Sequence, residues 1–486
     1  MRFALFYVLV EIIMVCNVSS RAQITPKIQW QKCLGGSNAD YPGSVIETKD
    51  GGYITVGYSN SIDGDITNHY GGTDVWIVKQ DVYGNIKWQK TYGEIGVEFA
   101  SDIKQTFDMG YIICGERGPN GWIFKIDSIG NLEWQKEYPS IDTSRSNHLY
   151  FIITTKDGGY LALGNDYGLA NGLIIKLDSL GKVEWQKTYG GTDQDYIYKG
   201  FQAENGSYTL IGESSSKDGD VTHNNGGKDV WVMKLDSIGN IEWQKTYGGS
   251  SDDGIGAVLS TIDGGIIFSG YSESKDGDVS VNRGYDDAWI VKLNSTGGIE
   301  WQKTYGGSNK DAAIGIINTS DGGYIIGAYS YSNDYNITGN HGSSDYWLLK
   351  LDSIGQMQWQ KNYGGSSTDI LTSIIQSDKN FVMTGYSFSN DNDVEGNHGE
   401  WDYWTIKLDE LIINSTQLLY NNCLKIWPNP INNGQLTIEG EELLSNIEIY
   451  NILGERVAQK SSIGKLIQLN LEGLPNGVYV AKVLSA

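Results

Sequence analysis

Aspartate pairs with one residue between them recur along the chain, and they are its clearest candidates for chemistry. Carboxylates at positions i and i+2 can offer hard oxygen ligands to Ca²⁺. Four such pairs occur: Asp63 and Asp65, Asp218 and Asp220, Asp276 and Asp278, and Asp391 and Asp393. None has the alternating oxygen ligands and closing glutamate of an EF-hand loop. Calcium is the one cofactor that the sequence suggests, and a solvated Asp-Gly turn explains the same residues.

Histidines lie in three of these loops and in the equivalent loop that begins at Asn333-Asp334. Four of the five histidines occur there, one per copy of the repeat: His69, His223, His341 and His398. A catalytic histidine is normally a single residue beside a placed partner, whereas these recur at a regular spacing. No Ser-His-Asp order, carboxylate pair or zinc motif stands apart from this recurrence. The sequence therefore predicts no catalytic residue and favours a protein without enzymatic activity.

The elements that position these loops are copies of one unit. The tripeptide Trp-Gln-Lys begins at Trp30, Trp88, Trp134, Trp185, Trp243, Trp301 and Trp359. A repeat of this length with β-type composition is typical of propeller blades. One copy predicts four strands, over residues 199–203, 207–212, 230–235 and 241–247. Asp-Gly-Gly, as at residues 263–265, predicts the hairpin between the first two strands.

The two ends of the repeat region are complementary. Trp30 belongs to a fourth-strand sequence that no first three strands precede, whereas residues 371–408 supply three strands that no Trp-Gln-Lys follows. In a ring these pieces would complete one blade and leave no sheet edge bare. The sequence thus predicts an all-β fold with a closed seven-bladed propeller over residues 24–409. Its motifs, such as Trp243-Gln-Lys-Thr-Tyr-Gly-Gly and Asp287-Ala-Trp-Ile-Val-Lys-Leu, resemble the bacterial SBBP-type β-propeller repeats, which implies an extracellular protein and no transferable catalytic residues.

Two neighbouring copies depart from the others. The connection between their second and third strands is short, so they lack the tall loop and predict a notch in the rim of the propeller. Binding sites on repeat folds tend to lie where the repeats differ. The candidate ligand-binding residues of this notch are Glu116, Arg117, Arg145, His148, Tyr150, Asp166 and Tyr167.

The composition and the N-terminus bear on partners and location. Asp and Glu total 59 against 36 Lys and Arg, a formal net charge of −23, which argues against nucleic-acid binding. Residues 1–22 predict an export signal, with Arg2 before an apolar stretch and Ser20-Arg21-Ala22 as a cleavage site. No segment is apolar and long enough to predict a transmembrane helix.

The C-terminal region has another character. After a linker over residues 410–423, alternating apolar positions predict a small Ig-like β-sandwich over residues 424–486. Its motif residues are Pro428, Asn429, Pro430, Gly454, Gly477 and Tyr479. These motifs resemble the C-terminal sorting domain (Por family, type A) of the type IX secretion system of Bacteroidetes. The family usually continues into a last strand with basic residues, so here the strand is trimmed or the signal is weakened.

The resemblance implies recognition by the type IX secretion machinery and a place outside the cell or on its outer-membrane surface. The preferred hypothesis is a secreted or surface-displayed binding and scaffold propeller, whose ligand is an extracellular glycan or protein. Two alternatives stay open: a carbohydrate-active hydrolase or lyase with its site on the loop face, and a structural adhesion or surface-layer component.

Overall fold

The protein is described here from a computed structural model, which describes residues 25–140, 146–409, 424–427, 435–451, 455–472, 474 and 479–485. It divides into two compact units, one over Thr25–Leu411 and one that contains the C-terminal residues. Every regular element in the described ranges is a β-strand. The all-β class predicted from the sequence is therefore confirmed.

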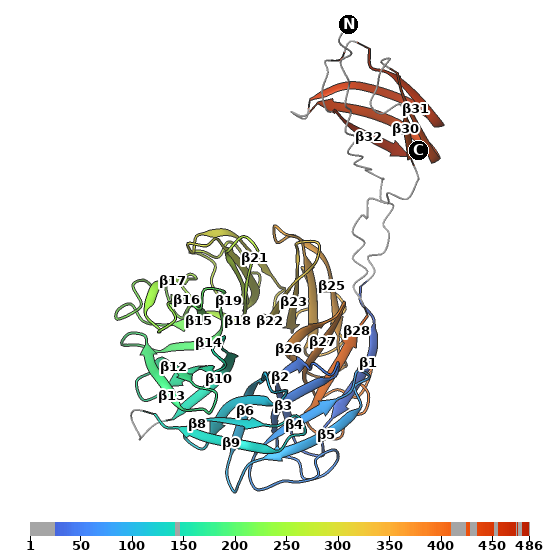
Figure 1. Cartoon of the computed structure of the whole chain (residues 1–486). Helices are drawn as coiled ribbons and strands as arrows, with labels where there is room; N and C mark the ends of the chain where they lie inside the picture. The colour runs from blue at the N-terminus through green and yellow to red at the C-terminus, as the bar shows by residue number, and fades with distance from the viewer. Residues whose placement is uncertain are drawn as a thin grey trace. The chain divides into compact units, whose positions relative to one another are not determined.

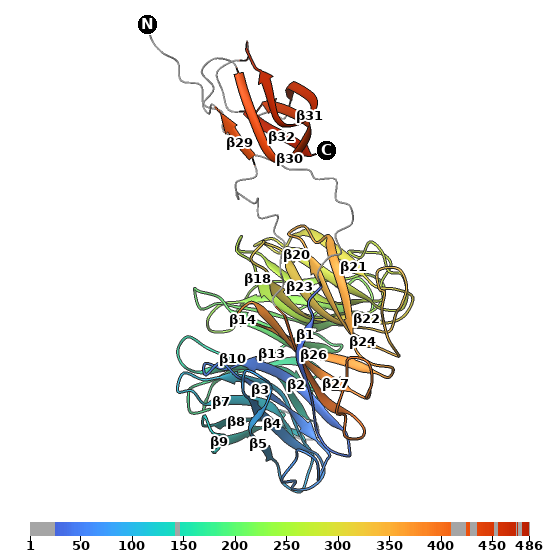
Figure 2. The ribbon, with the colours of Figure 1, turned by 90° about the vertical axis from the view of Figure 1, so that its right-hand side faces the viewer.

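The larger unit consists of four-stranded antiparallel sheets that lie side by side around a common centre (Figure 1); Figure 2 shows the same sheets from the side. In chain order the first sheets are β2 (Asp40–Glu47), β3 (Tyr53–Ser59), β4 (Asp74–Gln80), β5 (Ile86–Tyr92); β6 (Glu98–Gln105), β7 (Tyr111–Arg117), β8 (Asn120–Ile126), β9 (Leu132–Tyr138); and β10 (Asn147–Thr154), β11 (Tyr160–Asp166), β12 (Asn171–Leu177), β13 (Val183–Tyr189). Then follow β14 (Asp195–Gln202), β15 (Tyr208–Ser214), β16 (Asp229–Leu235), β17 (Ile241–Tyr247); β18 (Asp253–Ser260), β19 (Ile266–Ser272), β20 (Asp287–Leu293), β21 (Ile299–Tyr305); and β22 (Asp311–Asn318), β23 (Tyr324–Ser330), β24 (Asp345–Leu351), β25 (Met357–Tyr363). The last sheet joins β26 (Asp369–Ser377), β27 (Asn380–Ser387) and β28 (Asp402–Leu408) to β1 (Ile28–Leu34). Repeated sheets of this kind are typical of a β-propeller.

Local sequence explains the hairpin between the third and fourth strands. In the turn from β16 to β17, the Asp236 carboxylate accepts the backbone N–H groups of Ile238 at 3.0 Å and Asn240 at 2.8 Å. Gly239 follows with φ +80°, a conformation that a side chain would disfavour. A register shift then falls between Lys234 and Leu235, so the Asp-Ser-Ile-Gly-Asn sequence encodes a bulged hairpin.

The Trp-Gln-Lys-Thr-Tyr sequence joins each sheet to the next one. The Tyr247 hydroxyl donates to the Gly297 carbonyl in the following hairpin turn at 2.6 Å. A methyl group on Gly297 would lie 3.2 Å from the Trp243 ring, so this ring covers the glycine. Tyr92, Tyr138, Tyr189 and Tyr305 make the same contact with Gly130, Gly181, Gly239 and Gly355. These motif positions therefore hold the sheets together.

Lysines on the third strands are buried at the hairpin face, where the Asp-Gly-Gly turns lie. Lys292 contacts Asp263 at 2.8 Å and Glu300 at 2.9 Å. Equivalent lysines contact the turn aspartates of other sheets: Lys79, Lys125, Lys176 and Lys350 with Asp50, Asp108, Asp157 and Asp321. Each buried ammonium is thus paired, as burial of a charge requires.

The first and last parts of the larger unit are in contact. β1 pairs with β28 along six positions, with Gln31 opposite Ile406 and Cys33 opposite Trp404. The Tyr363 hydroxyl donates to the Pro26 carbonyl at 2.6 Å, the contact that other sheets make with a turn glycine. The hydroxyls of Tyr53 and Ser377 lie 3.0 Å apart.

The described C-terminal residues form a single sheet of β29 (Leu424–Trp427), β30 (Gln435–Asn451), β31 (Arg456–Asn470) and β32 (Tyr479–Ser485). β29 pairs with the first half of β30, and β32 pairs with its second half. Side chains from both halves, among them Leu436, Ile438, Ile447 and Ile449, share one buried cluster.

Candidate functional site

The loop aspartates bind backbone groups of the neighbouring loop. The Asp276 carboxylate accepts the Ser250 N–H at 2.7 Å, and Asp278 accepts the Gly248 N–H at 3.3 Å. The other pairs repeat these contacts: Asp63 and Asp65 with Ser37 and Gly35, Asp218 and Asp220 with Thr192 and Gly190, and Asp391 and Asp393 with Ser366 and Gly364. These backbone hydrogen bonds lower the pKa of Asp63.

The repeat that contains Asn336 shows which chemical group the second loop-aspartate position requires. There Asn336 replaces the second aspartate, and its side-chain oxygen accepts the Gly306 N–H at 3.3 Å. An uncharged amide therefore makes the contact that a carboxylate makes elsewhere, so a hydrogen-bond acceptor suffices. Across the described ranges, no three His, Cys, Asp or Glu side chains group as a metal site. Calcium binding stays a prediction.

The loop histidines contact residues of their own loops. His341 and His398 place Nδ1 at 2.7 Å and 2.6 Å from Asp345 and Asp402, and His69 lies near Asp74. The fourth, His223, contacts Asn225 at 2.9 Å. In these contacts the histidines orient their loops and do not converge on a common centre.

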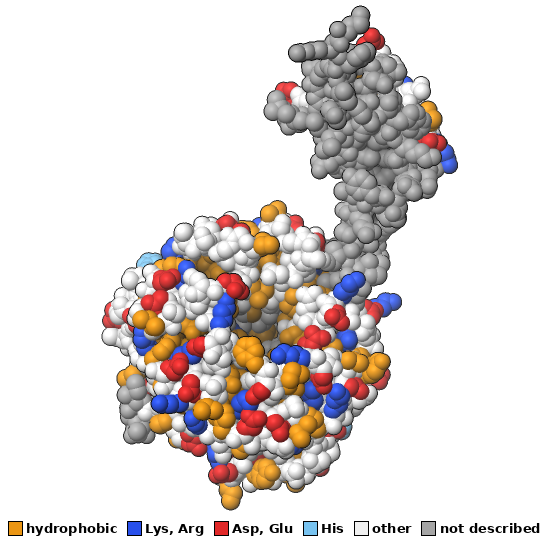
Figure 3. Space-filling view, viewed as in Figure 1, with side chains coloured by type: hydrophobic (Ala, Val, Ile, Leu, Met, Phe, Trp, Pro, Cys, Tyr) orange, Lys and Arg blue, Asp and Glu red, His pale blue; other side chains and the backbone are white. Residues whose placement is uncertain are grey.

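The ends of the first two strands of each sheet form what we call the inner rim. Its members are paired residues of adjacent strands: Tyr41 and Tyr58, Phe99 and Glu116, His148 and Asn165, Tyr196 and Glu213, Gly254 and Tyr271, Ala312 and Tyr329, and Ile370 and Tyr386. All lie at the end of the sheets where the long loops emerge. Figure 3 shows hydrophobic side chains around a central hollow on one face of this unit.

Four of the seven predicted notch residues come together at one place: Glu116 and His148 of the inner rim, with Tyr150 and Tyr167 beside them. His148 Nε2 lies 2.6 Å from the Glu116 carboxylate, and the His148 ring lies 4.8 Å from the ring of Tyr167. The hydroxyls of Tyr150 and Tyr167 are 2.8 Å apart. Burial raises the pKa of Tyr150, so this phenol stays neutral at physiological pH. The cluster combines an acid–imidazole pair with phenol groups.

The other three predicted notch residues are placed differently. Arg117 turns toward Glu94, Glu98 and Glu137. Asp166 is buried and accepts the Ser140 hydroxyl at 2.6 Å and the Gly168 N–H at 2.8 Å, so it shapes the loop. Arg145 lies outside the described residues.

Sequence reasoning missed the neighbouring side chains of β14. The Tyr196 and Tyr198 rings stack at 5.8 Å, and Tyr198 lies 5.1 Å from the Tyr150 ring. Lys228 Nζ lies 5.2 Å above the Tyr196 ring. A signal was available, because β18 has glycines at the two positions where β14 has tyrosines.

Buried carboxylates face each other at the same end of neighbouring sheets. Asp229 begins β16, Asp253 begins β18, and a methyl group on Gly248 would lie 2.5 Å from an oxygen of each. Asp229 Oδ1 has no hydrogen-bond partner in the described part of the chain. Burial, with the charge of Asp253, raises the Asp229 pKa to about 6. Similar pairs are Asp402 and Asp40, Asp287 and Asp311, and Asp345 and Asp369.

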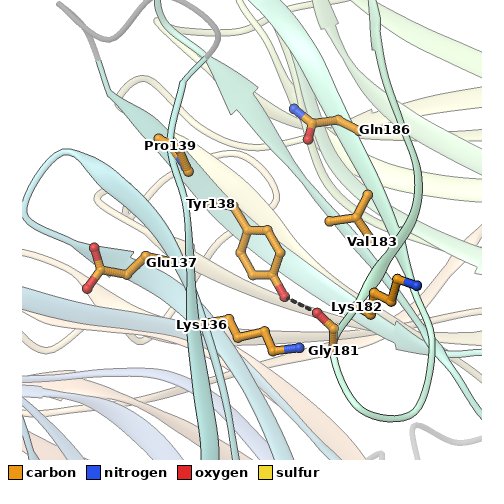
Figure 4. Close-up of a pocket in the computed structure, with 8 residues that line it drawn as sticks. All are labelled: Lys136, Glu137, Tyr138, Pro139, Gly181, Lys182, Val183 and Gln186. Carbon is orange, nitrogen blue, oxygen red and sulfur yellow. Dashed lines mark hydrogen bonds between the residues drawn. The ribbon is translucent and has the colours of Figure 1, made fainter.

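An open pocket of about 590 Å³ lies on the outer strands, away from the inner rim. Its wall includes β9 and the hairpin turn after β12, and Figure 4 shows the Tyr138 hydroxyl directed at the Gly181 carbonyl, 2.9 Å away. This is the contact that joins sheets elsewhere. Lys136, also in the wall, donates to the Leu180 carbonyl at 2.7 Å. The pocket is thus a consequence of sheet packing.

Comparison with known proteins assigns the C-terminal region. Residues 425–486 match the family described as secretion system C-terminal sorting domain. The protein is therefore secreted by the type IX system to the cell surface or the extracellular space, and its tail interacts with that machinery. Of the predicted motif residues, Tyr479 begins β32, and Pro428, Asn429, Pro430, Gly454 and Gly477 lie outside the described residues. The described part of the chain contains no helix that could span a membrane.

No curated protein matches the chain. Solved structures similar to it include the WD40 domain of Neurospora crassa Pan2, at 10% identity and a TM-score of 0.46, covering 77% of this chain and 95% of that one. A putative 6-phosphogluconolactonase from Bacteroides fragilis is 14% identical, with a TM-score of 0.41; the match covers 71% of this chain and 96% of that one. PorZ, a surface component of the type IX system of Porphyromonas gingivalis, is 13% identical, with a TM-score of 0.39; the match covers 88% of this chain and 56% of that one. Such identities carry nothing about function.

Proposed function

We propose that the protein is a binding propeller displayed outside the cell, whose ligand surface is the cluster of Glu116, His148, Tyr150 and Tyr167. The observation that carries this proposal is that residues which differ from those at the equivalent positions of other sheets lie together at one part of the inner rim. Gly254 and Ala312 occupy the His148 position in other sheets, so the acid–imidazole pair is not a requirement of the repeat. Convergent polar groups beside aromatic rings at a concave mouth are typical of ligand sites.

The proposed scaffold is a closed ring of seven blades over residues 24–409. The β1–β28 ladder and the hydrogen bond from Tyr363 to Pro26 support closure. The compact unit Thr25–Leu411 supports the boundaries of the ring. The proposed organisation adds an export signal over residues 1–22, a linker over 410–423 and a sandwich over 424–486. The shared core of both halves of β30 supports the sandwich.

The binding role is tested with the full chain on arrays of glycans and in capture of extracellular proteins. We expect at least one specific ligand, with affinity reduced tenfold or more by His148→Ala and by Tyr167→Ala. Lys275→Ala is the control, because Lys275 is exposed on the loop of another sheet. A chain that captures nothing, or whose binding is indifferent to both notch variants, contradicts the proposal.

A further inference from the structure

Four aromatic side chains form a continuous surface where the last sheet meets the β2–β5 sheet. They are Tyr41, Tyr386, Phe388 and Trp401, and we call them the Trp401 platform. The Trp401 ring lies 5.2 Å from Tyr386, 5.1 Å from Phe388 and 6.3 Å from Tyr41. The Tyr41 and Tyr386 rings are 5.1 Å apart and nearly perpendicular. Tyr41 and Tyr386 belong to the inner rim, and the platform shares no residue with the His148 cluster; the Tyr58 ring, 5.2 Å from the Tyr41 ring, lies beside the platform.

Trp401 is unlike the repeat tryptophans. Five third-strand tryptophans, such as Trp347, are fully buried, and Trp347 donates to Gln360 at 3.0 Å. Trp401 instead precedes its strand, is only half-buried, and its indole N–H makes no hydrogen bond within the described ranges. The same position carries Thr73, Lys228, Asp286 and Ser344 in other sheets. Core packing therefore does not require a tryptophan here.

Phe388 strengthens this conclusion. Its side chain is 47% exposed, and the equivalent positions are Asn60, Ser215 and Glu273 in three other sheets and Tyr331 in a fourth. The repeat therefore does not require a phenylalanine here, and a large apolar side chain that stays in water loses hydrophobic stabilisation. An exposed aromatic patch on a secreted protein is typical of a binding surface.

The polar groups of the platform define the ligand class. The hydroxyls of Tyr41 and Tyr386 form no hydrogen bond with any described residue, and burial raises the pKa of both phenols, so they remain neutral donors. Glu400 is the charged group that acts on Tyr41, and none of the cation–π contacts in the described chain involves the platform. The surface thus combines flat apolar rings, neutral donors and one carboxylate acceptor.

We propose that the Trp401 platform binds a neutral glycan, whose sugar rings stack on the aromatic faces while its hydroxyls exchange hydrogen bonds with Tyr41, Tyr386 and Glu400. An anionic ligand would meet the Glu400 carboxylate, a like charge. Three half-buried rings and the exposed Phe388 present much less surface than the ~800 Å² per partner of a standard protein interface, which favours a small ligand over a protein.

The proposal rests on the binding role proposed above and adds a second site. The test titrates the full chain with neutral hexasaccharides (β-1,3-glucan, β-1,4-glucan, α-1,4-glucan, β-1,4-xylan and β-1,4-mannan), with an anionic uronate hexasaccharide for comparison. We expect calorimetric binding of a neutral glycan, weakened at least tenfold by Trp401→Ala and about threefold by Tyr386→Phe. Tyr271→Phe is the matched control, since Tyr271 has the equivalent place in another sheet and should leave affinity unchanged.

Circular dichroism and the thermal midpoint of Trp401→Ala show whether the variant folds. A folded Trp401→Ala variant with wild-type affinity overturns the platform, and loss of binding in His148→Ala would then leave the binding role in place. Absence of binding to all neutral probes overturns the platform as well. Tighter binding of the uronate, or capture of a protein that depends on Trp401, contradicts the ligand class.

Discussion

Replacement of Asp229 by asparagine tests the buried carboxylate pairs directly. Asp229 is fully buried, Oδ2 accepts the Asn225 N–H at 2.7 Å, and Oδ1 faces Asp253 without a hydrogen bond in the described chain. Asn171 has the same place in the neighbouring sheet, opposite Asp195, so the fold already accommodates this side chain. An amide would remove one of two like charges and could donate to Asp253.

The size and the sign of the effect on the free energy of unfolding follow from the Asp229 pKa. Burial first, and then the charges of Asp253 and Asp278, raise it from 3.8 to about 6. Folding therefore favours the protonated carboxyl, and the stability that Asp229 contributes is complete below about pH 4 and is lost as pH rises through about 6. A shift of this size corresponds to about 3 kcal/mol, and solvent screening reduces it to about 1–2 kcal/mol.

We therefore expect the stability difference between Asp229→Asn and wild type to grow in favour of the variant by about 1–2 kcal/mol from pH 4 to pH 8. Urea unfolding followed by tryptophan fluorescence measures it at each pH. Titrating groups that do not interact with Asp229 act on both proteins and cancel in the difference. A difference that stays constant, or that moves against the variant as pH rises, refutes the reasoning.

Asp236→Asn is the matched control with the opposite sign. The exposed Asp236 carboxylate accepts the Asn240 and Ile238 N–H groups, and these hydrogen bonds lower its pKa. The stability that the Asp236 carboxylate contributes is present above the ordinary pKa of an aspartate and is lost as pH falls through the lowered pKa. We expect the control to be less stable than wild type at pH 7.5 and to approach it in acid.

Three further substitutions test the contacts that hold the sheets. Lys292→Met leaves Asp263 and Glu300 without their shared cation, and because both carboxylates are about half exposed we expect urea titration to show a loss of only about 1 kcal/mol. Tyr247→Phe removes the hydroxyl that donates to Gly297 and should cost about 1 kcal/mol by the same measurement, with an unchanged value speaking against the contact. Gly297→Ala forces a side chain into φ +73° beneath Trp243, so we expect its thermal midpoint to fall, by an amount equivalent to about 1–2 kcal/mol.

Some of the candidate site followed from the sequence, and some did not. The departure of two copies from the repeat pointed to Glu116, His148, Tyr150 and Tyr167, which do lie together. The same reasoning included Asp166, because a sequence comparison of copies does not distinguish a loop-shaping carboxylate from a free one. It did not identify Trp401, because one tryptophan in a long loop gives no indication of the aromatic rings that the fold places beside it.

The sequence by itself determined the repeated strands, their hairpin turns and the sorting domain, because hydrophobic alternation, turn residues and motif order act over short stretches of chain. Only the tertiary structure decided what the polar residues do. Asp278 meets Gly248 thirty positions earlier, and Asp229 faces Asp253 across two sheets. Partners so far apart in the chain become neighbours only when the sheets pack, so the spacing that suggested calcium ligands gave no information about the backbone amides that these carboxylates bind.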